Sequence, residues 1–166
     1  MDERVSFEGY VAARSEGLQR FAYLVCGDVG EAHELVQTAL VALYPRWVEV
    51  AGRGDPEAYV RRSIVNAQIT VWRRQRRERP TDDLDVLDRV GAVDVADTVT
   101  DADLVARLFA VLAPRQRAVL VMRFYERRSF SEIAEACGCA EATARSLVHR
   151  ALATLRAHVC AGSGDD

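Results

Sequence analysis

Polar and basic side chains recur at helical spacing near the end of the chain, between residues 141 and 150. They comprise Thr143, Arg145, Ser146, His149 and Arg150. Hydroxyl, imidazole and guanidinium groups can donate hydrogen bonds to base edges and to phosphate oxygens. The same residue types also form the ordinary solvated face of a helix, so the spacing alone leaves both interpretations open.

Two short helices must position this polar face. Ile133, Ala134 and Cys137 share one side of the first helix, and Gly138 predicts a tight turn after it. The apolar stripe of the second helix comprises Leu147, Val148, Ala151, Leu152 and Leu155. Two helices joined by a glycine-containing turn, the second with an outward polar and basic face, are typical of a helix-turn-helix.

Three longer helices are predicted in the first half of the chain. A period of about 3.6 residues runs from residue 7 to 25, and Gly27 should end that helix. Asp28 is placed to cap a second helix, in which Pro45 should cause a kink or an end. Asp55 followed by Pro56 predicts the start of a third helix, over about residues 56–77.

Charge is distributed unevenly along a chain whose formal net charge is −3. Seven arginines and one acid lie between residues 61 and 79, and eight aspartates and one arginine lie between residues 82 and 103. Such a division suggests separate partners for the two blocks. We therefore expect an all-α protein with two small helical domains, over 5–79 and 101–159, joined by an acidic flexible linker over 80–100. The apolar residues of the linker leave open whether it docks on a surface.

The cysteines and histidines give weak support for a metal site. Cys137 and Cys139 form a C-x-C, and His149 and His158 follow on the next helix. Zinc ligands usually show a wider cysteine spacing, so structural thiols are the preferred interpretation. We expect neither a metal nor a cofactor.

Other features argue against catalysis and membrane insertion. His33, His149 and His158 suggest no catalytic triad, and no glycine-rich phosphate loop is present. No apolar run approaches the roughly 20 residues that span a bilayer, and the first residues lack the pattern of a secretion signal. We expect a cytoplasmic protein that is not an enzyme.

Five motifs together resemble the extracytoplasmic-function class of bacterial sigma-70 factors, and an actinobacterial SigE-type subgroup in particular. They are LVQTAL at 35–40, DPEAYVRRSIVN at 55–66, WRRQRR at 72–77, LAPRQRAVLVMRF at 112–124 and FSEIAEACGCAEATARSLVHRALATLR at 130–156. The resemblance covers nearly the whole chain in the order of the family. It implies a sigma region 2 domain, a linker and a sigma region 4 domain, without the middle region 3 domain.

The resemblance implies an RNA polymerase sigma factor, which binds core polymerase, recognises the −35 and −10 promoter elements and promotes DNA melting. The expected partners are promoter DNA and the β′ coiled coil and β flap of core polymerase. Many relatives are held by an anti-sigma factor, which makes such a protein a further candidate partner. The linker would thread the active-site cleft and the RNA exit channel.

The family's polymerase-binding face maps onto the second helix. The implied residues are Glu34, Leu35, Gln37 and Thr38. The usual pattern has acids near positions 33 and 38, whereas this chain has His33 and Thr38. The contact is therefore expected to rest more on Glu34 and Gln37, and an ordinary solvated face is the alternative.

The −10 reader maps onto the third helix. The implied residues are Tyr59, Arg61, Arg62, Asn66, Trp72, Arg73, Arg74, Arg76 and Arg77. Arginines attract phosphates, Asn66 can hydrogen-bond a base edge, and Tyr59 or Trp72 can stack on a base. For both aromatic residues, packing in the core is the alternative.

The −35 reader maps onto the helix-turn-helix. Its implied base-reading and supporting residues are Glu141, Thr143, Arg145, Ser146, His149 and Arg150, and its implied phosphate contacts are Arg115, Arg117 and Arg128. Arg145 is the strongest candidate because its planar guanidinium can donate two hydrogen bonds at once, either to O6 and N7 of guanine or to two phosphate oxygens. Glu141 either accepts a hydrogen bond from cytosine N4 or caps the helix. Leu147 stands where the family often has arginine, so one usual DNA contact is expected to be missing.

Two other functions remain as alternatives. A one-component repressor would explain the helix-turn-helix, but not the basic third helix or the acidic linker. A degenerate sigma-like protein that only binds partners would explain the departures at His33 and Thr38. Tight binding to duplex DNA without polymerase would favour the repressor.

Overall fold

Capping residues set the limits of the first two helices in the computed structural model, which describes residues 6–78 and 101–162. α1 (Phe7–Cys26) begins where Ser6 Oγ accepts a backbone N–H of the first turn at 3.0 Å. It ends at Gly27, whose φ of 81° is costly for residues with a Cβ. Asp28 then caps α2 (Val29–Leu43) through its side chain.

Pro45 ends the second helix, as the sequence predicts. α2 stops at Leu43 and is followed by the 3₁₀ turn η1 (Tyr44–Arg46), because proline cannot donate the hydrogen bond that would continue an α-helix. Trp47 begins a separate short helix, α3 (Trp47–Arg53). The Trp47 ring packs edge-on against the Phe7 ring, with centroids 5.6 Å apart, so the start of α3 contacts the start of α1.

The longest helix of this half is α4 (Pro56–Glu78). Asp55 Oδ1 accepts the Glu57 N–H at 2.9 Å, which confirms the predicted N-cap. One face of α4 is buried, and it includes Ala58, Val60, Ile64 and Val65. The exposed arginines are Arg62 near its start and Arg73, Arg74, Arg76 and Arg77 near its end, so the exposed positive charge is concentrated towards the two ends of the helix.

The second half ends in the predicted helix-turn-helix. Its elements are α6 (Asp101–Leu108), η2 (Phe109–Val111), α7 (Pro114–Leu120), η3 (Val121–Tyr125), α8 (Phe130–Cys137) and α9 (Glu141–Gly162). The helical spacing of Val119, Leu120, Met122 and Phe124 predicts one helix from about Arg115 to Tyr125. Instead α7 widens into the single π-type turn η3, where the Glu126 N–H donates to the Val121 carbonyl.

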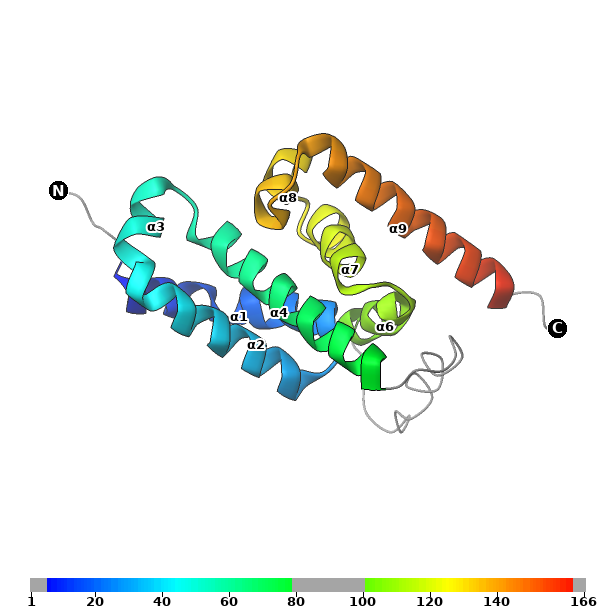
Figure 1. Ribbon diagram of the computed structural model, residues 1–166, viewed down its shortest axis with the longest axis horizontal. Helices are drawn as coiled ribbons and strands as arrows, with labels where there is room; N and C mark the ends of the chain where they lie inside the picture. The colour runs from blue at the N-terminus through cyan, green and yellow to red at the C-terminus, as the bar shows by residue number, and fades with distance from the viewer. Residues whose placement is uncertain (1–5, 79–100, 163–166) are drawn as a thin grey trace.

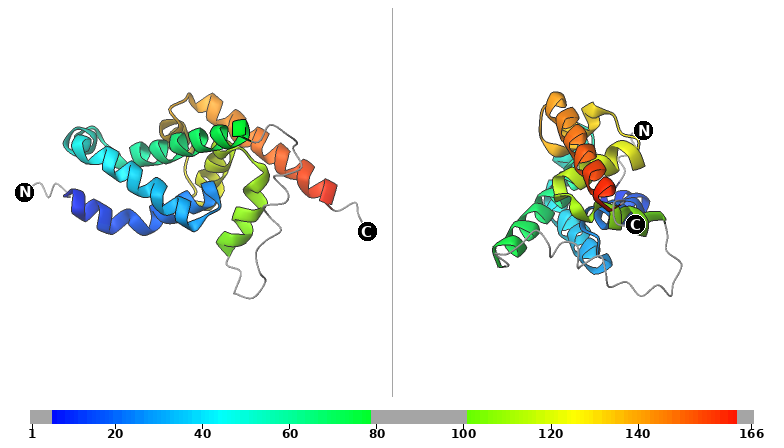
Figure 2. Two further views of the ribbon diagram at one scale, coloured as in Figure 1. Left: turned by 60° about the horizontal axis from the view of Figure 1, so that its bottom comes forward. Right: turned by 90° about the vertical axis from the view of Figure 1, so that its right-hand side faces the viewer.

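The two halves pack against each other. α1 lies against α6 and α7, and α4 lies against α7 and α8 (Figure 1). The views of Figure 2 show α4 beside the second half from two further directions. Buried side chains of both halves, such as Phe21 and Met122, belong to one hydrophobic cluster. We call the surface between α1 and α4 on one side and residues 101–137 on the other the seam.

The all-α class is confirmed, since residues 6–78 and 101–162 form helices and turns without a strand. The acidic linker predicted over 80–100 lies outside the described residues. None of the helices in the described ranges is both long and apolar enough to cross a membrane.

Candidate nucleic-acid interface

The polar face found in the sequence is exposed on α9. Ala144, Val148 and Ala151 are buried against the rest of the molecule, which turns the other side of the helix outward. The exposed side carries Glu141, Thr143, Arg145, Ser146, His149 and Arg150. The structure therefore brings together the residues predicted to read the −35 element on the first two to three turns of α9 (Figure 1).

The turn before α9 has the geometry of a helix-turn-helix. Gly138 caps α8 with a φ of 63°, and its N–H donates to carbonyls of the last turn of α8. The Cys139 N–H donates to the Ala134 carbonyl at 3.0 Å, completing the C-terminal cap. This turn sets the angle at which α9 leaves α8.

Arg145 is exposed but held in place. Its Nη2 lies 2.5 Å from Glu141 Oε1, one helical turn away. Its guanidinium also lies over the ring of Phe130, 5.1 Å from the centroid. These contacts limit the rotamers of a long side chain, so less conformational entropy is lost when it binds a base or a phosphate.

Two of the three arginines expected to reach DNA phosphates are occupied inside the protein. Arg117 donates to the carbonyls of Leu112, Ala110 and Val25 at 2.8, 2.9 and 3.1 Å. Burial lowers the pKa of its guanidinium. The prediction that Arg117 contacts phosphate does not fit this placement. Arg128 is half-buried and pairs with Glu57 and Glu132, at 3.8 and 3.6 Å.

The third of these arginines lies near the turn of the helix-turn-helix. Arg115 Nη2 donates to the Cys137 carbonyl at 3.4 Å, at the end of α8. The side chain is half-buried. A cation close to the last carbonyls of a helix is stabilised by the helix dipole, so Arg115 also has a structural role in this arrangement.

The far half of α4 carries an exposed basic surface. Arg73, Arg74, Arg76 and Arg77 are exposed, as is Asn66 two turns earlier. Trp72 is half-buried, and the Arg76 guanidinium lies 4.7 Å from its ring centroid. Arg46 lies over Tyr59 in the same way, at 5.5 Å. Both aromatic rings are therefore partly buried, and each has an arginine guanidinium over its ring.

The two remaining residues expected to read the −10 element lie at the seam. Arg61 is only 5 % exposed, and pairs with Glu57 and Glu126. The guanidinium of Arg61 is buried between carboxylates, so the predicted DNA contact does not fit this placement. Arg62 is exposed, but its Nη2 donates to the Glu135 carbonyl in the last turn of α8.

The predicted polymerase-binding face of α2 is exposed, with one exception. Glu34, Gln37 and Thr38 are open to solvent, and the Gln37 amide lies 2.9 Å from His33 Nε2. Leu35 is 6 % exposed because it packs into the core. Its side chain cannot reach a partner, so its assignment to the face is corrected.

The sequence reasoning missed the acids that pair with Arg61. Glu57 is 7 % exposed, and Glu126 comes from the opposite side of the seam. Glu57 stands one helical turn before Arg61, which is a detectable signal for an ion pair within the helix. Nothing local in the sequence indicates that Glu126 meets them.

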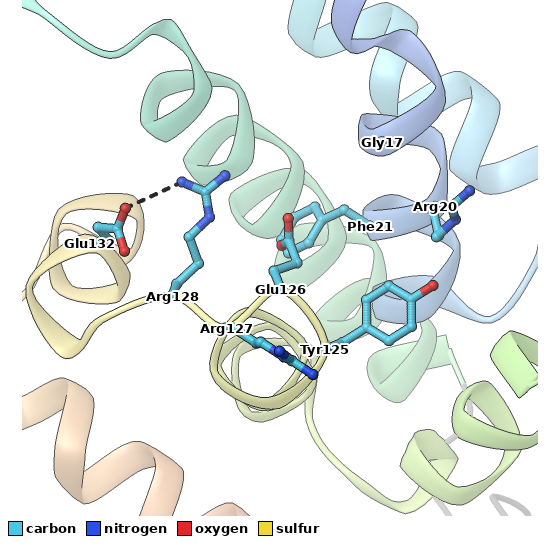
Figure 3. Close-up of a pocket in the computed structure, with 8 residues that line it drawn as sticks. All are labelled: Gly17, Arg20, Phe21, Tyr125, Glu126, Arg127, Arg128 and Glu132. Atoms are coloured by element: carbon cyan, nitrogen blue, oxygen red, sulfur yellow. Dashed lines mark ion pairs between the residues drawn. The ribbon is translucent and has the colours of Figure 1, made fainter.

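A pocket of ≈ 400 Å³ opens at this part of the seam. Figure 3 shows Gly17 and Phe21 of α1 on one side, and Glu126, Arg127 and Arg128 on the other. Arg127 has a φ of 55°, which marks the sharp turn between η3 and α8. Water can therefore reach the edge of the ion pairs that join the two halves.

The described residues contain no group of three or more His, Cys, Asp or Glu side chains that could hold a metal ion. Cys137 and Cys139 are half-buried thiols, and burial raises the pKa of Cys137 to about 11. A thiol with this pKa is mostly protonated at neutral pH, which agrees with a structural role.

Comparison with known proteins places both halves in one family. Residues 4–78 match the model of sigma-70 region 2, and residues 102–155 match that of sigma-70 region 4. An RNA polymerase sigma-E factor of Streptomyces avermitilis is 39% identical over 93% of this chain and 85% of its own length. The RNA polymerase sigma-E factor of Streptomyces coelicolor is 37% identical over 97% of this chain and 90% of its own length.

A solved structure has the same fold. The sigma factor RpoE of Bartonella quintana, crystallised with the anti-sigma factor NepR, superposes with a TM-score of 0.67. The match covers 96% of this chain and 98% of that one, at 20% identity. Together with the two exposed basic faces, these relationships establish that the chain belongs to the sigma-70 family and is an RNA polymerase sigma factor of the extracytoplasmic-function class.

Proposed function

We propose that this sigma factor reads promoters at two points, through two sets of exposed residues. The exposed face of α9, led by Arg145, reads the −35 element. The exposed part of α4 from Asn66 to Arg77 holds the −10 element. The separation of these two basic faces on two helical halves of one chain is the observation that carries the proposal.

Each face suits a different task. The first turns of an exposed recognition helix can enter the major groove and reach base edges. The α4 face combines four exposed arginines with Trp72 and Asn66, which suits a separated strand with unstacked bases. Engaging four phosphates of a single strand predicts a salt slope of roughly −3 from that face alone.

The exposed residues of α2 are proposed to dock on the β′ coiled coil of core polymerase, and the second half on the β flap. Glu34 and Gln37 provide a charged and a polar group on neighbouring turns of one exposed helix face. An anti-sigma factor is a candidate competitor for the same surfaces. The site of action is the cytoplasm, where polymerase and promoter DNA meet.

Substituting Glu34→Arg tests the docking face. Glu34 is exposed, so the reversal of charge should weaken core-polymerase binding by about tenfold while the helical signal stays unchanged. Glu16→Arg, another exposed acid on a different helix, is the matched control. Full affinity of Glu34→Arg in a pull-down with core enzyme would remove α2 from the interface.

A further inference from the structure

We infer that Phe130 is a positioning residue for promoter recognition, because its ring holds the Arg145 guanidinium in place for the −35 element. The inference rests on the proposed reading of that element by α9. Phe130 is the first residue of α8, the first helix of the helix-turn-helix, and Arg145 lies near the start of α9. A residue outside the recognition helix thus sets how precisely that helix reads a base.

The Phe130 ring is itself held by the protein. It is half-buried and packs against the hydrophobic cluster that both halves share. The capping box formed by Ser129 and Glu132 fixes the backbone where Phe130 begins α8. The ring therefore has a defined place on which the long side chain of Arg145 can rest.

Two arginines lie over this one ring. The Arg123 guanidinium is 4.3 Å from the ring centroid, and that of Arg145 is 5.1 Å from it. Arg123 comes from η3, and its Nη1 donates to the Arg128 carbonyl at 3.1 Å, in the turn before α8. Arg123 is half-buried, whereas Arg145 is exposed. The ring thus connects a guanidinium that is bonded within the protein to one that is open to DNA.

An aromatic ring can hold a guanidinium without occupying its hydrogen-bond donors. The cation is attracted to the π face, so its five N–H groups stay available for a base or a phosphate. The pair with Glu141 differs, because Nη2 of Arg145 lies 2.5 Å from a carboxylate oxygen. Base reading competes with that ion pair for a donor, but it does not compete with the ring. The Phe130 contact is therefore the one that can persist on DNA.

The energy of this contact sets the size of the expected effect. A cation–π contact at an exposed site changes an equilibrium constant by about two- to fivefold. The bidentate base contact that it supports changes base discrimination by about five- to 150-fold. Loss of the Phe130 ring should therefore weaken the discrimination in part, and loss of the Arg145 guanidinium should remove it.

Substituting Phe130→Leu tests the positioning role. In transcription with core polymerase from a library randomised at the −35 element, the preferred base should lose about two- to fivefold of its advantage over the other bases. Phe130→Tyr keeps an aromatic ring and should keep the preference. Phe124→Leu changes an exposed phenylalanine of η3 and should also keep it.

A purely structural role for Phe130 predicts a different pattern. Loss of folded protein lowers transcription from every library member and leaves the ratio between bases unchanged. Positioning changes that ratio, and does so only through Arg145. In the Arg145→Ala background, Phe130→Leu should therefore have no further effect on the ratio. Additive effects of the two substitutions on the ratio would overturn the inference.

Nuclear magnetic resonance of the wild-type full chain tests the contact without relying on the folding of Phe130→Leu. Arg145→Lys identifies the Nε–Hε signal of Arg145 by its loss, and Arg156→Lys does the same for an exposed arginine farther along α9. The ring current of Phe130 should shift the Arg145 signal, and 15N relaxation should show a more rigid Nε than that of Arg156. Equal shifts and equal mobility of the two signals would overturn the inference.

The library experiment also separates this inference from the proposed function. Suppose that Arg145→Ala loses the −35 preference while folded Phe130→Leu keeps it in full. That result would overturn the positioning role and leave α9 as the −35 reader. An unchanged preference in Arg145→Ala would instead overturn base reading by Arg145, and the role of Phe130 in specificity with it.

Discussion

Arg145 is the single side chain on which promoter recognition should depend most. It lies on the exposed first turns of α9, where Glu141 and Phe130 restrict its position. A guanidinium fork fits guanine O6 and N7, and a good bidentate contact contributes about 1–3 kcal/mol of base discrimination. The residue is therefore positioned before it meets DNA.

Substituting Arg145→Ala should relax the preference at one or two positions of the −35 element, at a cost of about 1–3 kcal/mol for the preferred base. Transcription from a promoter library randomised at the −35 element measures this directly. Arg156→Ala removes an exposed arginine farther along the same helix and should leave the base preference intact. An unchanged −35 profile for Arg145→Ala would exclude base reading by this residue.

Residue exposure could be predicted from the sequence only where it depends on helix periodicity. The outward face of α9 and the arginines at the end of α4 follow from apolar spacing within one helix. Arg61 is buried and Arg117 is half-buried, and each bonds to a partner far away in sequence: Glu126, 65 residues from Arg61, and the Val25 carbonyl, 92 residues from Arg117. No local pattern encodes such long-range contacts. The burial of Leu35 could have been predicted from the sequence, because Leu35 lies on the apolar stripe of its own helix.

Helix limits are the part of the fold that the sequence specifies best. Gly27, Pro45, Asp55 and Gly138 each mark a boundary that the structure confirms. Their effects are local, since they depend on allowed φ values and on nearby N–H groups. The π-type turn η3 was not predicted, because it depends on how residues 121–126 pack between both halves.

Ser129→Ala tests the local capping of the helix-turn-helix. Ser129 Oγ accepts the Glu132 N–H at 3.1 Å, and Glu132 accepts the Ser129 N–H at 2.8 Å, which forms a capping box. We expect the free energy of unfolding to fall by about 1 kcal/mol in a chemical denaturation at neutral pH. Ser131→Ala, inside the same helix, should be neutral or stabilising by up to about 0.5 kcal/mol. Equal effects of the two changes would argue against the cap.

The pH dependence of this cap has a defined sign. The Ser129 N–H lowers the pKa of the Glu132 carboxyl. A lowered pKa in the folded state contributes stability above the ordinary glutamate pKa, and this contribution is lost as the pH falls through the lowered value. The cap should therefore loosen in acid.

The whole molecule combines modules that the sequence predicts with a packing that it does not. Two all-α halves and their order follow from motifs and periodicity. Their closed packing depends on the seam, where Glu126, Asp103 and the Val25 carbonyl meet residues distant in sequence.

Run-off transcription with core polymerase on a genomic promoter library tests the sigma-factor assignment most directly. Adding the protein should direct initiation to a set of promoters that share one −35 and one −10 motif at constant spacing, and Glu34→Arg should reduce this activity. Failure to add any promoter-specific transcript, together with tight binding of the protein alone to duplex DNA, would contradict the sigma-factor function and favour a repressor.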